Sequence, residues 1–240
     1  MEHRGWNVID AERGVLWREY AFTRGAWATT LVFRGPDGLV VVSPASGLGP
    51  EDYDALAPFG QVRALVANNP AHHLGQAAWR ARFPDARSYA DPRSLLRLGE
   101  VAPDVAFEPI AALALGDAAH VDPLDGYPSG ELLIRVAVAT GSVWFTGDLL
   151  TNIQRTPGPP FSWLFRWSGS APGFRLFKLG IWTSVRDRPA LRRQVEGLLD
   201  RDPPAVLVPG HGPPVEADGL VFLVREQESR AGRKLRSAAR

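Results

Sequence analysis

Residues 68–75 read Asn68-Asn69-Pro70-Ala71-His72-His73-Leu74-Gly75 and follow directly on the apolar residues 62–67, which predict a compact strand. Asparagine and proline favour a turn at this point. Imidazole nitrogens are common metal ligands, so two histidines in a polar turn at a strand end have the shape of a metal-binding loop. Several other ligand types expected in such a loop are missing from it. This combination is the starting point for both fold and function.

The surrounding sequence predicts alternating strands and helices. Residues 29–33 and 39–42 form a hairpin around Gly35-Pro36-Asp37-Gly38, and residues 132–138 and 143–146 form a second hairpin around Thr140-Gly141. Other strands are expected at residues 87–90, 105–110 and 205–208, and helices at residues 51–56, 74–83, 92–98, 188–200 and 218–228. The basic residues 230–240 are expected to be a frayed tail. Two β-rich blocks separated by helices result.

Composition limits the chemistry and the partners of the chain. With no cysteine among 240 residues there is no disulfide, no thiolate nucleophile and no sulfur ligand for a metal. A formal net charge of +1 provides no strong overall field for nucleic acid or a membrane surface. No apolar run approaches the roughly 20 residues that span a bilayer. The amino terminus lacks the apolar core of a signal peptide, so a cytoplasmic location is the default expectation.

Further candidate ligands also follow predicted strands. His211 lies in Val208-Pro209-Gly210-His211-Gly212, after the strand at 205–208. Asp148 lies in Gly147-Asp148-Leu149, after the strand at 143–146. Such positions present side chains at one edge of a sheet. Imidazole and carboxylate together suit zinc, or iron or manganese.

The order of these candidate ligands along the chain resembles that of the metallo-β-lactamase-fold superfamily, over roughly residues 25–215. That superfamily has the metal loop H-x-H-x-D-H-x-G, followed along the chain by the motifs G-H-T-x-G, G-D and G-H. Asn68 and Pro70 fall on the first two histidines of the loop, and His72 and His73 fall on its D-H pair. Tyr127 of Gly126-Tyr127-Pro128-Ser129-Gly130 falls on the intermediate histidine. Asp148 matches the aspartate of the G-D motif, and His211 matches the histidine of the final G-H motif.

The resemblance implies a four-layer αββα sandwich of two mixed β-sheets, forming a single domain over residues 1–229. Of the two metals in the superfamily, the first would lose its ligands at Asn68, Pro70 and Tyr127. The second would keep a complete set of ligands, namely His72, His73, Asp148 and His211. The N-x-x-x-H-H form of the loop, with Trp79 and Glu131 downstream, resembles a divergent group within the superfamily. One divalent ion, with zinc first and iron or manganese as alternatives, is therefore expected.

If one coordination position stays open, such an ion lowers the pKa of its bound water towards roughly 7. The function expected is hydrolysis of a small ester, lactone, thioester or amide by a mononuclear metal-bound water. A non-catalytic or sensory metal-binding protein is the first alternative. An iron-dependent oxidoreductase is the second. The partner expected is a small-molecule substrate, with no nucleic acid and no transmembrane segment.

Individual site residues have competing interpretations. Adjacent side chains usually point in different directions, so the alternative to two ligands is that one of His72 and His73 ligates while the other caps a helix or supports a ligand. For Asp148 the alternative is a cap of a turn. Asn68 either hydrogen-bonds a metal-bound water or only forms the turn, and Glu131 accepts a proton, supports the site or is simply solvated. Catalytic roles are assigned on this basis to Asp148, Asn68 and Glu131.

Residues 152–174 are rich in proline, glycine and aromatic residues. This composition predicts a long loop without a regular element, placed as a lid. Its aromatic part, within residues 159–168, could close over a hydrophobic substrate, contact a partner or a membrane surface, or pack as core.

Overall fold

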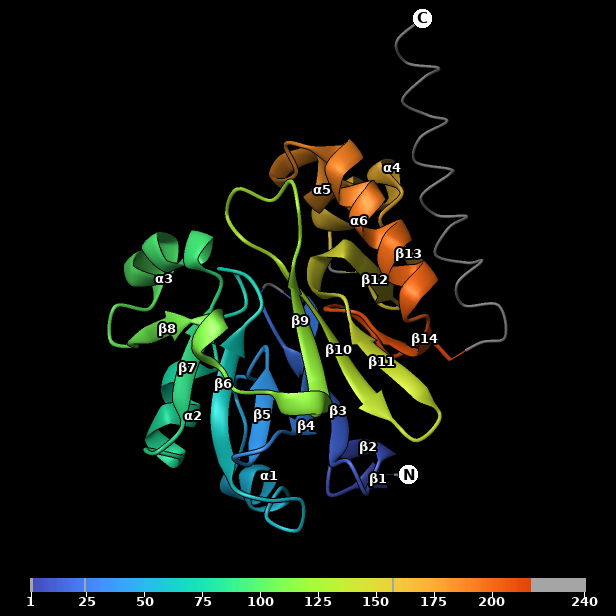
Figure 1. Ribbon diagram of the computed structural model, residues 1–240. Coiled ribbons are helices and arrows are strands. Elements are labelled where there is room, and N and C mark those ends of the chain that lie inside the picture. The colour runs from blue at the N-terminus through green and yellow to red at the C-terminus, as the bar shows by residue number, and fades with distance from the viewer. Residues whose placement is uncertain (1, 24, 157, 217–240) are drawn as a thin grey trace, which may run out of the picture.

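The computed structural model describes residues 2–23, 25–156 and 158–216, and its strands form two large sheets and one small ribbon (Figure 1). The first sheet has eight strands in the order of the sequence. Strands β1 to β5 pair antiparallel and β5 to β8 pair parallel, so the sheet is mixed. Its strands are β1 (Glu2–His3), β2 (Trp6–Asp10), β3 (Val15–Ala21), β4 (Trp27–Arg34), β5 (Leu39–Val42), β6 (Val62–Ala67), β7 (Arg87–Ala90) and β8 (Phe107–Pro109).

The second sheet has four strands in the order β14-β11-β10-β9. It too is mixed, because β11 pairs antiparallel with β10 but parallel with β14. A separate ribbon pairs β12 with β13. The strands are β9 (Ala119–Pro123), β10 (Leu132–Val138), β11 (Gly141–Phe145), β12 (Leu150–Ile153), β13 (Gly173–Leu176) and β14 (Pro204–Val208).

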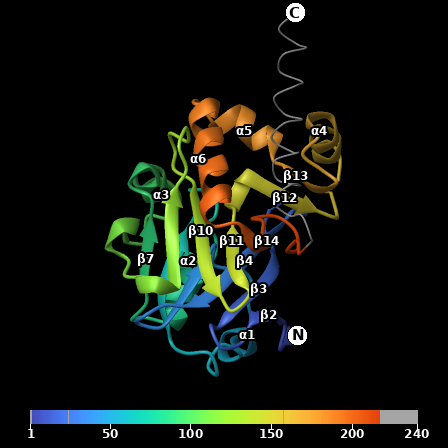
Figure 2. The same cartoon turned by 45° about the vertical axis from the view of Figure 1, so that its right-hand side comes forward.

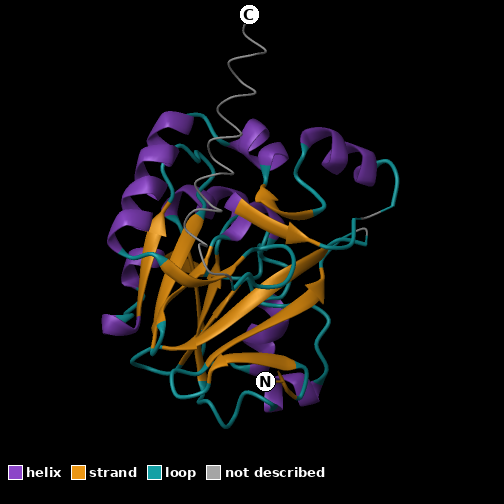
Figure 3. Cartoon of the chain, turned by 90° about the vertical axis from the view of Figure 1, so that its right-hand side faces the viewer, coloured by secondary structure: helices purple, strands orange, loops and turns teal. Residues whose placement is uncertain are grey.

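Helices cover both outer faces of the paired sheets (Figure 3). Helices α1 and α2 cover the first sheet, and α6 covers the second. The α-helices are α1 (Pro50–Asp54), α2 (Gln76–Arg82), α3 (Leu95–Val101), α4 (Phe161–Ser168), α5 (Lys178–Ser184) and α6 (Arg188–Arg201). Short 3-10 helices are η1 (Pro92–Ser94), η2 (Ile110–Ala112), η3 (Gly116–Ala118) and η4 (Gly147–Leu149).

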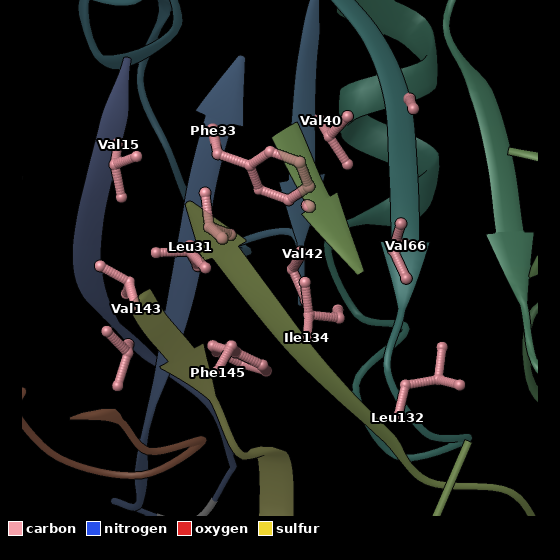
Figure 4. Packing of buried hydrophobic residues seen from close by; sticks show 14 of the residues in the cluster. Val15, Leu31, Phe33, Val40, Val42, Val66, Leu132, Ile134, Val143 and Phe145 are labelled. Carbon is pink, nitrogen blue, oxygen red and sulfur yellow. The ribbon is translucent and has the colours of Figure 1, made fainter. Parts of the chain in front are cut away.

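The central core lies between the two sheets (Figure 4). Alternate residues of each strand point into it, as the period of two in a strand requires. Leu31 and Phe33 of β4 meet Ile134 of β10 and Phe145 of β11, and all four side chains are buried. The core therefore joins two sheets that come from different halves of the chain.

Each outer layer has a core of its own. Helix α6 packs Leu191, Val195 and Leu198 against Trp144 and Leu207 of the second sheet. On the first sheet, Trp79 of α2 is fully buried, and its indole N–H donates to the Ala45 carbonyl at 2.8 Å. The layers run helix, sheet, sheet, helix, which confirms the predicted αββα sandwich.

Most elements that were expected from the sequence are present. The strands at 62–67 and 87–90 match β6 and β7, both hairpins form, and the amphipathic helix at 188–200 is α6. The first three strands, within residues 2–21, were not anticipated. The expected helix at 218–228 and the tail at 230–240 lie outside the described residues. Among the described helices, none combines the length and the apolar character needed to cross a membrane.

The prediction for residues 152–174 was wrong, because this segment contains the helix α4, the end of β12 and the first half of β13. Its prolines and glycines act at the ends of elements instead of preventing them. Pro160 occupies the N-cap of α4, and Gly169 ends the helix at a φ of 70°, the left-handed conformation that glycine adopts without strain. The turn-forming residues were therefore caps of a short helix.

Candidate metal centre

Three side chains from the ends of three strands meet beside the open edge of the two sheets. His72 lies in the turn after β6, Asp148 in η4 after β11, and His211 in the loop after β14. Each offers one ligand atom, and these atoms lie within 4.8 Å of one another. They form the one such group found among the described residues.

The two imidazoles approach the same carboxylate oxygen. Nε2 of His72 lies 3.2 Å from Asp148 Oδ1, and Nε2 of His211 lies 3.1 Å from the same atom. The other ring nitrogens are engaged elsewhere, since His72 Nδ1 lies 2.6 Å from Ser43 Oγ and His211 Nδ1 donates to the Trp27 carbonyl at 2.6 Å. A hydrogen bond at Nδ1 leaves the Nε2 atom of a neutral histidine free to ligate, which is the usual arrangement of metal-binding histidines.

The loop that carries His72 is held by Asn69. Its side-chain oxygen accepts from the backbone N–H groups of Ala71 and His72, at 2.8 and 3.3 Å. Such an asparagine turn explains why the chain reverses here before α2 begins. The amide nitrogen of Asn69 donates to Asp148 Oδ2 at 3.0 Å. Asn69 therefore fixes the loop and the carboxylate together.

The loop that carries His211 is fixed from both sides. The backbone N–H of Thr29 donates to the Gly210 carbonyl at 2.8 Å, and that of Asn152 donates to the His211 carbonyl at 2.7 Å. Gly212 adopts a φ of 96°, and a Cβ there would collide with the Asn152 carbonyl. The loop is thus attached to β4 through Gly210 and to β12 through His211.

Electrostatics favour an ionised carboxylate at this centre. Burial alone would raise the pKa of the Asp148 carboxyl, but His72 and His211 more than offset it and hold that pKa well below its usual range. Burial lowers the pKa of the His211 imidazole, whereas the hydrogen bond and the charge of Asp148 raise it, and the net result is a raised pKa. The two shifts favour an ionised Asp148 carboxylate beside the His211 imidazole.

A second polar cluster lies immediately behind the first and centres on Glu131, whose side chain is only 2% exposed. Asn68 Nδ2 donates to Glu131 Oε1 at 3.0 Å, Asn69 Nδ2 donates to Oε2 at 2.8 Å, and the backbone N–H of Asp148 donates to Oε1 at 3.2 Å. Burial and the nearby Asp148 charge raise the pKa of the Glu131 carboxyl well above its usual range. Gly147, at a φ of 51°, leaves no room for a Cβ beside Glu131.

The positions that the resemblance assigns to the other metal do not form a ligand group. Asn68 is engaged with Glu131, and Tyr127 is a buried core residue whose hydroxyl has a pKa raised by burial and by Glu131. Pro70 provides a carbonyl to His73, whose Nδ1–H donates to it at 2.8 Å. The structure does not bring His73 into the group of His72, Asp148 and His211.

Two residues that the sequence did not indicate also build the centre. The Phe22 ring stacks on His72 with a centroid distance of 5.1 Å and packs edge-on against His211 at 5.6 Å. Ser43, bonded to His72, has a φ of 52°, which costs energy in a residue other than glycine. Ser43 ends an apolar strand, so the same strand-end rule could have found it, whereas nothing in the sequence marks Phe22.

The centre opens onto a pocket of about 730 Å³. Asp148 and His211 lie in its wall, and four aromatic side chains also line it, those of Phe22, Trp27, Phe165 and Phe177. Glu19 and Arg155 bring opposite charges to the lining, and Arg155 lowers a Glu19 pKa that burial raises overall. Small molecules can therefore reach the carboxylate and one imidazole from an apolar cavity.

The donor set fits a divalent ion. Two imidazole nitrogens and one carboxylate oxygen are ligands that zinc, iron and manganese accept. Both imidazoles are oriented by hydrogen bonds at Nδ1, and the carboxylate is ionised. Three protein ligands beside an open pocket are the arrangement of catalytic zinc sites, in which the fourth position stays free.

Comparison with known proteins finds solved structures with a similar architecture. No family model matches the chain, and no curated protein matches its sequence. Solved structures do match. A metallo-β-lactamase from Erythrobacter litoralis is 17% identical, with 94% of this chain and 96% of that chain covered and a TM-score of 0.58.

Two further structures are similar at this level. The DIM-1 metallo-β-lactamase is 14% identical, with 96% of this chain and 100% of that chain covered and a TM-score of 0.57. A metal-soaked Flv1 flavodiiron core from Synechocystis is 13% identical, with 95% of this chain and 61% of that chain covered and a TM-score of 0.58. At such identities the likeness concerns the backbone and not the reaction. The two mixed sheets, the outer helices and these neighbours together establish that this chain has the metallo-β-lactamase fold.

Proposed function

We propose that the protein is a hydrolase that uses a single divalent metal ion to cleave a small ester, lactone, thioester or amide. The observation that carries the proposal is the group of His72, Asp148 and His211, whose ligand atoms lie within 4.8 Å of one another at the wall of a pocket. Zinc is the first choice for two imidazoles and a carboxylate, with iron or manganese as alternatives.

The bound ion would supply Lewis acidity and bring the pKa of a water molecule towards roughly 7. The residues of the chain hold and orient its ligands. Ser43 and the Trp27 carbonyl set the two imidazole rings, and Asn69 sets the carboxylate. Phe22 covers the rings of His72 and His211 and limits the access of bulk water to them.

Asn68 and Glu131 support the site in this proposal, and do not contact the substrate. Both side chains are buried and bonded to each other, and neither lines the pocket. Glu131 accepts from the backbone of Asp148, so it positions the carboxylate of that residue. The Nδ1–H of His73 is held by the Pro70 carbonyl, and His73 lies outside the ligand group. It becomes a fourth ligand only if its ring moves towards the other three residues.

The pocket lining favours a substrate with an apolar portion. Aromatic rings form much of the wall, and the charges of Glu19 and Arg155 lie near each other. An acyl chain or aromatic leaving group would bury apolar surface against Phe165 and Phe177. Esters and thioesters with such groups are therefore the first compounds to assay.

The test begins with metal analysis of protein purified without chelator. We expect about one equivalent of a transition metal per chain, since the described residues contain one ligand group. We also expect turnover of aryl esters or acyl thioesters that is lost in His211→Ala. The matched control is His120→Ala, which removes an exposed histidine of β9 and should leave turnover unchanged.

A metal content no higher than that of the buffer blank would overturn this function. Circular dichroism of His211→Ala is needed as well, because lost turnover is informative only in a folded variant. Metal binding without turnover of any acyl compound would favour the non-catalytic or sensory alternative.

A second candidate is an iron-dependent redox role. It is supported by the similarity to the Flv1 flavodiiron core and by the fact that imidazole and carboxylate also hold iron. Iron as the metal that copurifies, with a visible or paramagnetic signal that changes on reduction, would favour this role over hydrolysis. Zinc would exclude it, because zinc has no redox chemistry.

A further inference from the structure

Helices α4 and α5 expose large apolar side chains at one corner of the molecule, where α4 lies at the outer edge (Figure 2). Trp163 and Trp167 of α4 are 69% and 77% exposed. Leu164 of α4 and Trp182 of α5 are exposed as well, and the rings of Trp167 and Trp182 meet edge-on with centroids 6.0 Å apart. These four side chains form one apolar surface, called here the tryptophan face.

The tryptophan face is separate from the core contacts of the same helix. Residues three and four apart lie on one side of a helix, so Trp163, Arg166 and Trp167 share the outer side of α4. Phe165 points the other way, stacks on Phe177 at 5.9 Å and lines the pocket. The inward contacts of α4 are therefore made by Phe165, whereas Trp163 and Trp167 remain largely exposed, and the ring that Trp167 contacts, that of Trp182, is itself exposed.

The charge of this region is one-sided. Between Asp148 and Asp187 the sequence has no acidic residue, but it has Arg155, Arg166, Arg175, Lys178 and Arg186. All 26 acidic residues lie outside this segment, together with 22 basic ones. The net charge of +1 thus conceals a strongly basic segment beside a slightly acidic remainder.

We propose that the tryptophan face docks onto the surface of a lipid bilayer that contains anionic lipids. Tryptophan is enriched at the boundary between headgroups and acyl chains because its ring is apolar and its N–H is polar. Basic side chains close to such a surface are attracted by anionic headgroups. Exposed Trp163 and Trp167 beside exposed Arg166 combine both features on one side of α4.

Charge argues for this occupant over a second copy of the chain. A two-fold symmetric dimer would place the same patch against itself. Arg166 would then face its own symmetry mate in a segment without a carboxylate to offset it. An anionic surface instead complements the basic segment and accepts the tryptophan rings.

The experiment uses the full chain and vesicles of two compositions, phosphatidylcholine alone and phosphatidylcholine mixed with phosphatidylglycerol. We expect cosedimentation with the mixed vesicles only, weakened by added salt because exposed charges are screened. Trp163→Ala combined with Trp167→Ala should lower the apparent affinity by about tenfold or more. Arg166→Glu alone should lower it by a similar factor, since it removes one attraction and adds one repulsion.

The matched control lies on α3, on the other side of the molecule (Figure 1). Leu96→Ala with Arg97→Glu changes an apolar side chain that is 82% exposed and an exposed arginine beside it. This variant should bind the mixed vesicles like the unchanged chain. The altered side chains of all three variants are solvent-exposed, so their melting temperatures should stay close to that of the unchanged chain.

Three outcomes would overturn the proposal. The first is a failure of the unchanged chain to bind the mixed vesicles, and the second is an equal loss of binding in the α3 control. The third is self-association without lipid in sedimentation velocity that the tryptophan substitutions abolish, because a second copy would then be the occupant. None of these outcomes depends on whether the metal centre is catalytic.

Discussion

Two polar clusters share the loop of residues 68–75, and they differ in what they leave open. The centre of His72, Asp148 and His211 points ring nitrogens and a carboxylate oxygen at one shared space beside the pocket. The cluster around Glu131 turns its amides and carboxyl towards one another in the interior. Asn69 belongs to both, since its amide nitrogen donates to Glu131 and to Asp148.

The difference shows how one loop can support two kinds of polar site. In the closed cluster every donor that reaches Glu131 is a neutral amide, and the raised pKa of Glu131 favours its neutral form. In the open centre the pKa of Asp148 is lowered, so its charge is retained. Closed polar clusters stabilise a fold, whereas open ionised ones bind ligands. The predictions below test this division.

The largest effect is expected for Asp148→Ala. It removes the oxygen that both Nε2 atoms approach. Loss of a residue that only supports a ligand typically costs 10–100-fold in metal affinity, so loss of this ligand should cost at least about 100-fold. Titration calorimetry with zinc measures it. A zinc affinity within a few-fold of the unchanged protein would place the metal elsewhere.

Glu131→Leu should instead reduce stability. The N–H donors of Asn68, Asn69 and Asp148 lose their acceptor in the interior. At about 1–3 kcal/mol for each unpaired buried group, a loss of roughly 3 kcal/mol or more in the free energy of unfolding is expected. Glu131→Gln retains an acceptor and should lose less. Urea unfolding measures the stability of both variants. Equal losses of stability would mean that the lost hydrogen bonds are not the cause.

Ser43→Ala removes the hydroxyl group that lies against His72 Nδ1. Because a hydrogen bond at this nitrogen orients a ligating imidazole, zinc affinity should fall by about tenfold. Ser43→Gly is the informative partner, since it loses the same hydroxyl but relieves the positive φ. It should be more stable than Ser43→Ala by about 1 kcal/mol. Similar zinc affinities in both variants would confirm that the hydroxyl is the important group.

The smallest effect is expected for His73→Ala. The side chain donates to the Pro70 carbonyl and lies outside the ligand group. Zinc affinity should therefore change by less than about threefold. A loss as large as that of Asp148→Ala would show that His73 completes a four-ligand set, and the open centre would have to be redefined.

Part of the site could be predicted from the sequence, because the ends of apolar runs mark the ends of strands. Apolar runs end just before His72, Asp148 and His211, and neighbouring strands of a sheet bring their ends together. Adjacency made His72 and His73 equivalent as candidates, since their directions depend on the turn that Asn69 forms. No sequence pattern marked Phe22 as a site residue, because its contacts with His72 and His211 arise only from the packing of distant segments.

The elements of the fold could likewise be predicted where the sequence carries a clear pattern. Elements with a clear hydrophobic period were found, including β6, β7 and α6. The strands within residues 2–21 were missed, although Trp6 and Leu16 are fully buried there. The error at α4 arose because proline and glycine were interpreted as breakers of structure, whereas in the fold they stand at the helix ends.

The attachment of His211 to β12 gives the centre a reporter at a distance from its ligands. The backbone N–H of Asn152 donates to the His211 carbonyl, so it exchanges with solvent only when this part of the chain opens. Any ion that binds the folded form but not the opened one makes such opening rarer. Deuterium exchange at the Asn152 amide should therefore slow when the centre is filled. A slow amide on a strand without ligands of its own would record the occupancy of the site.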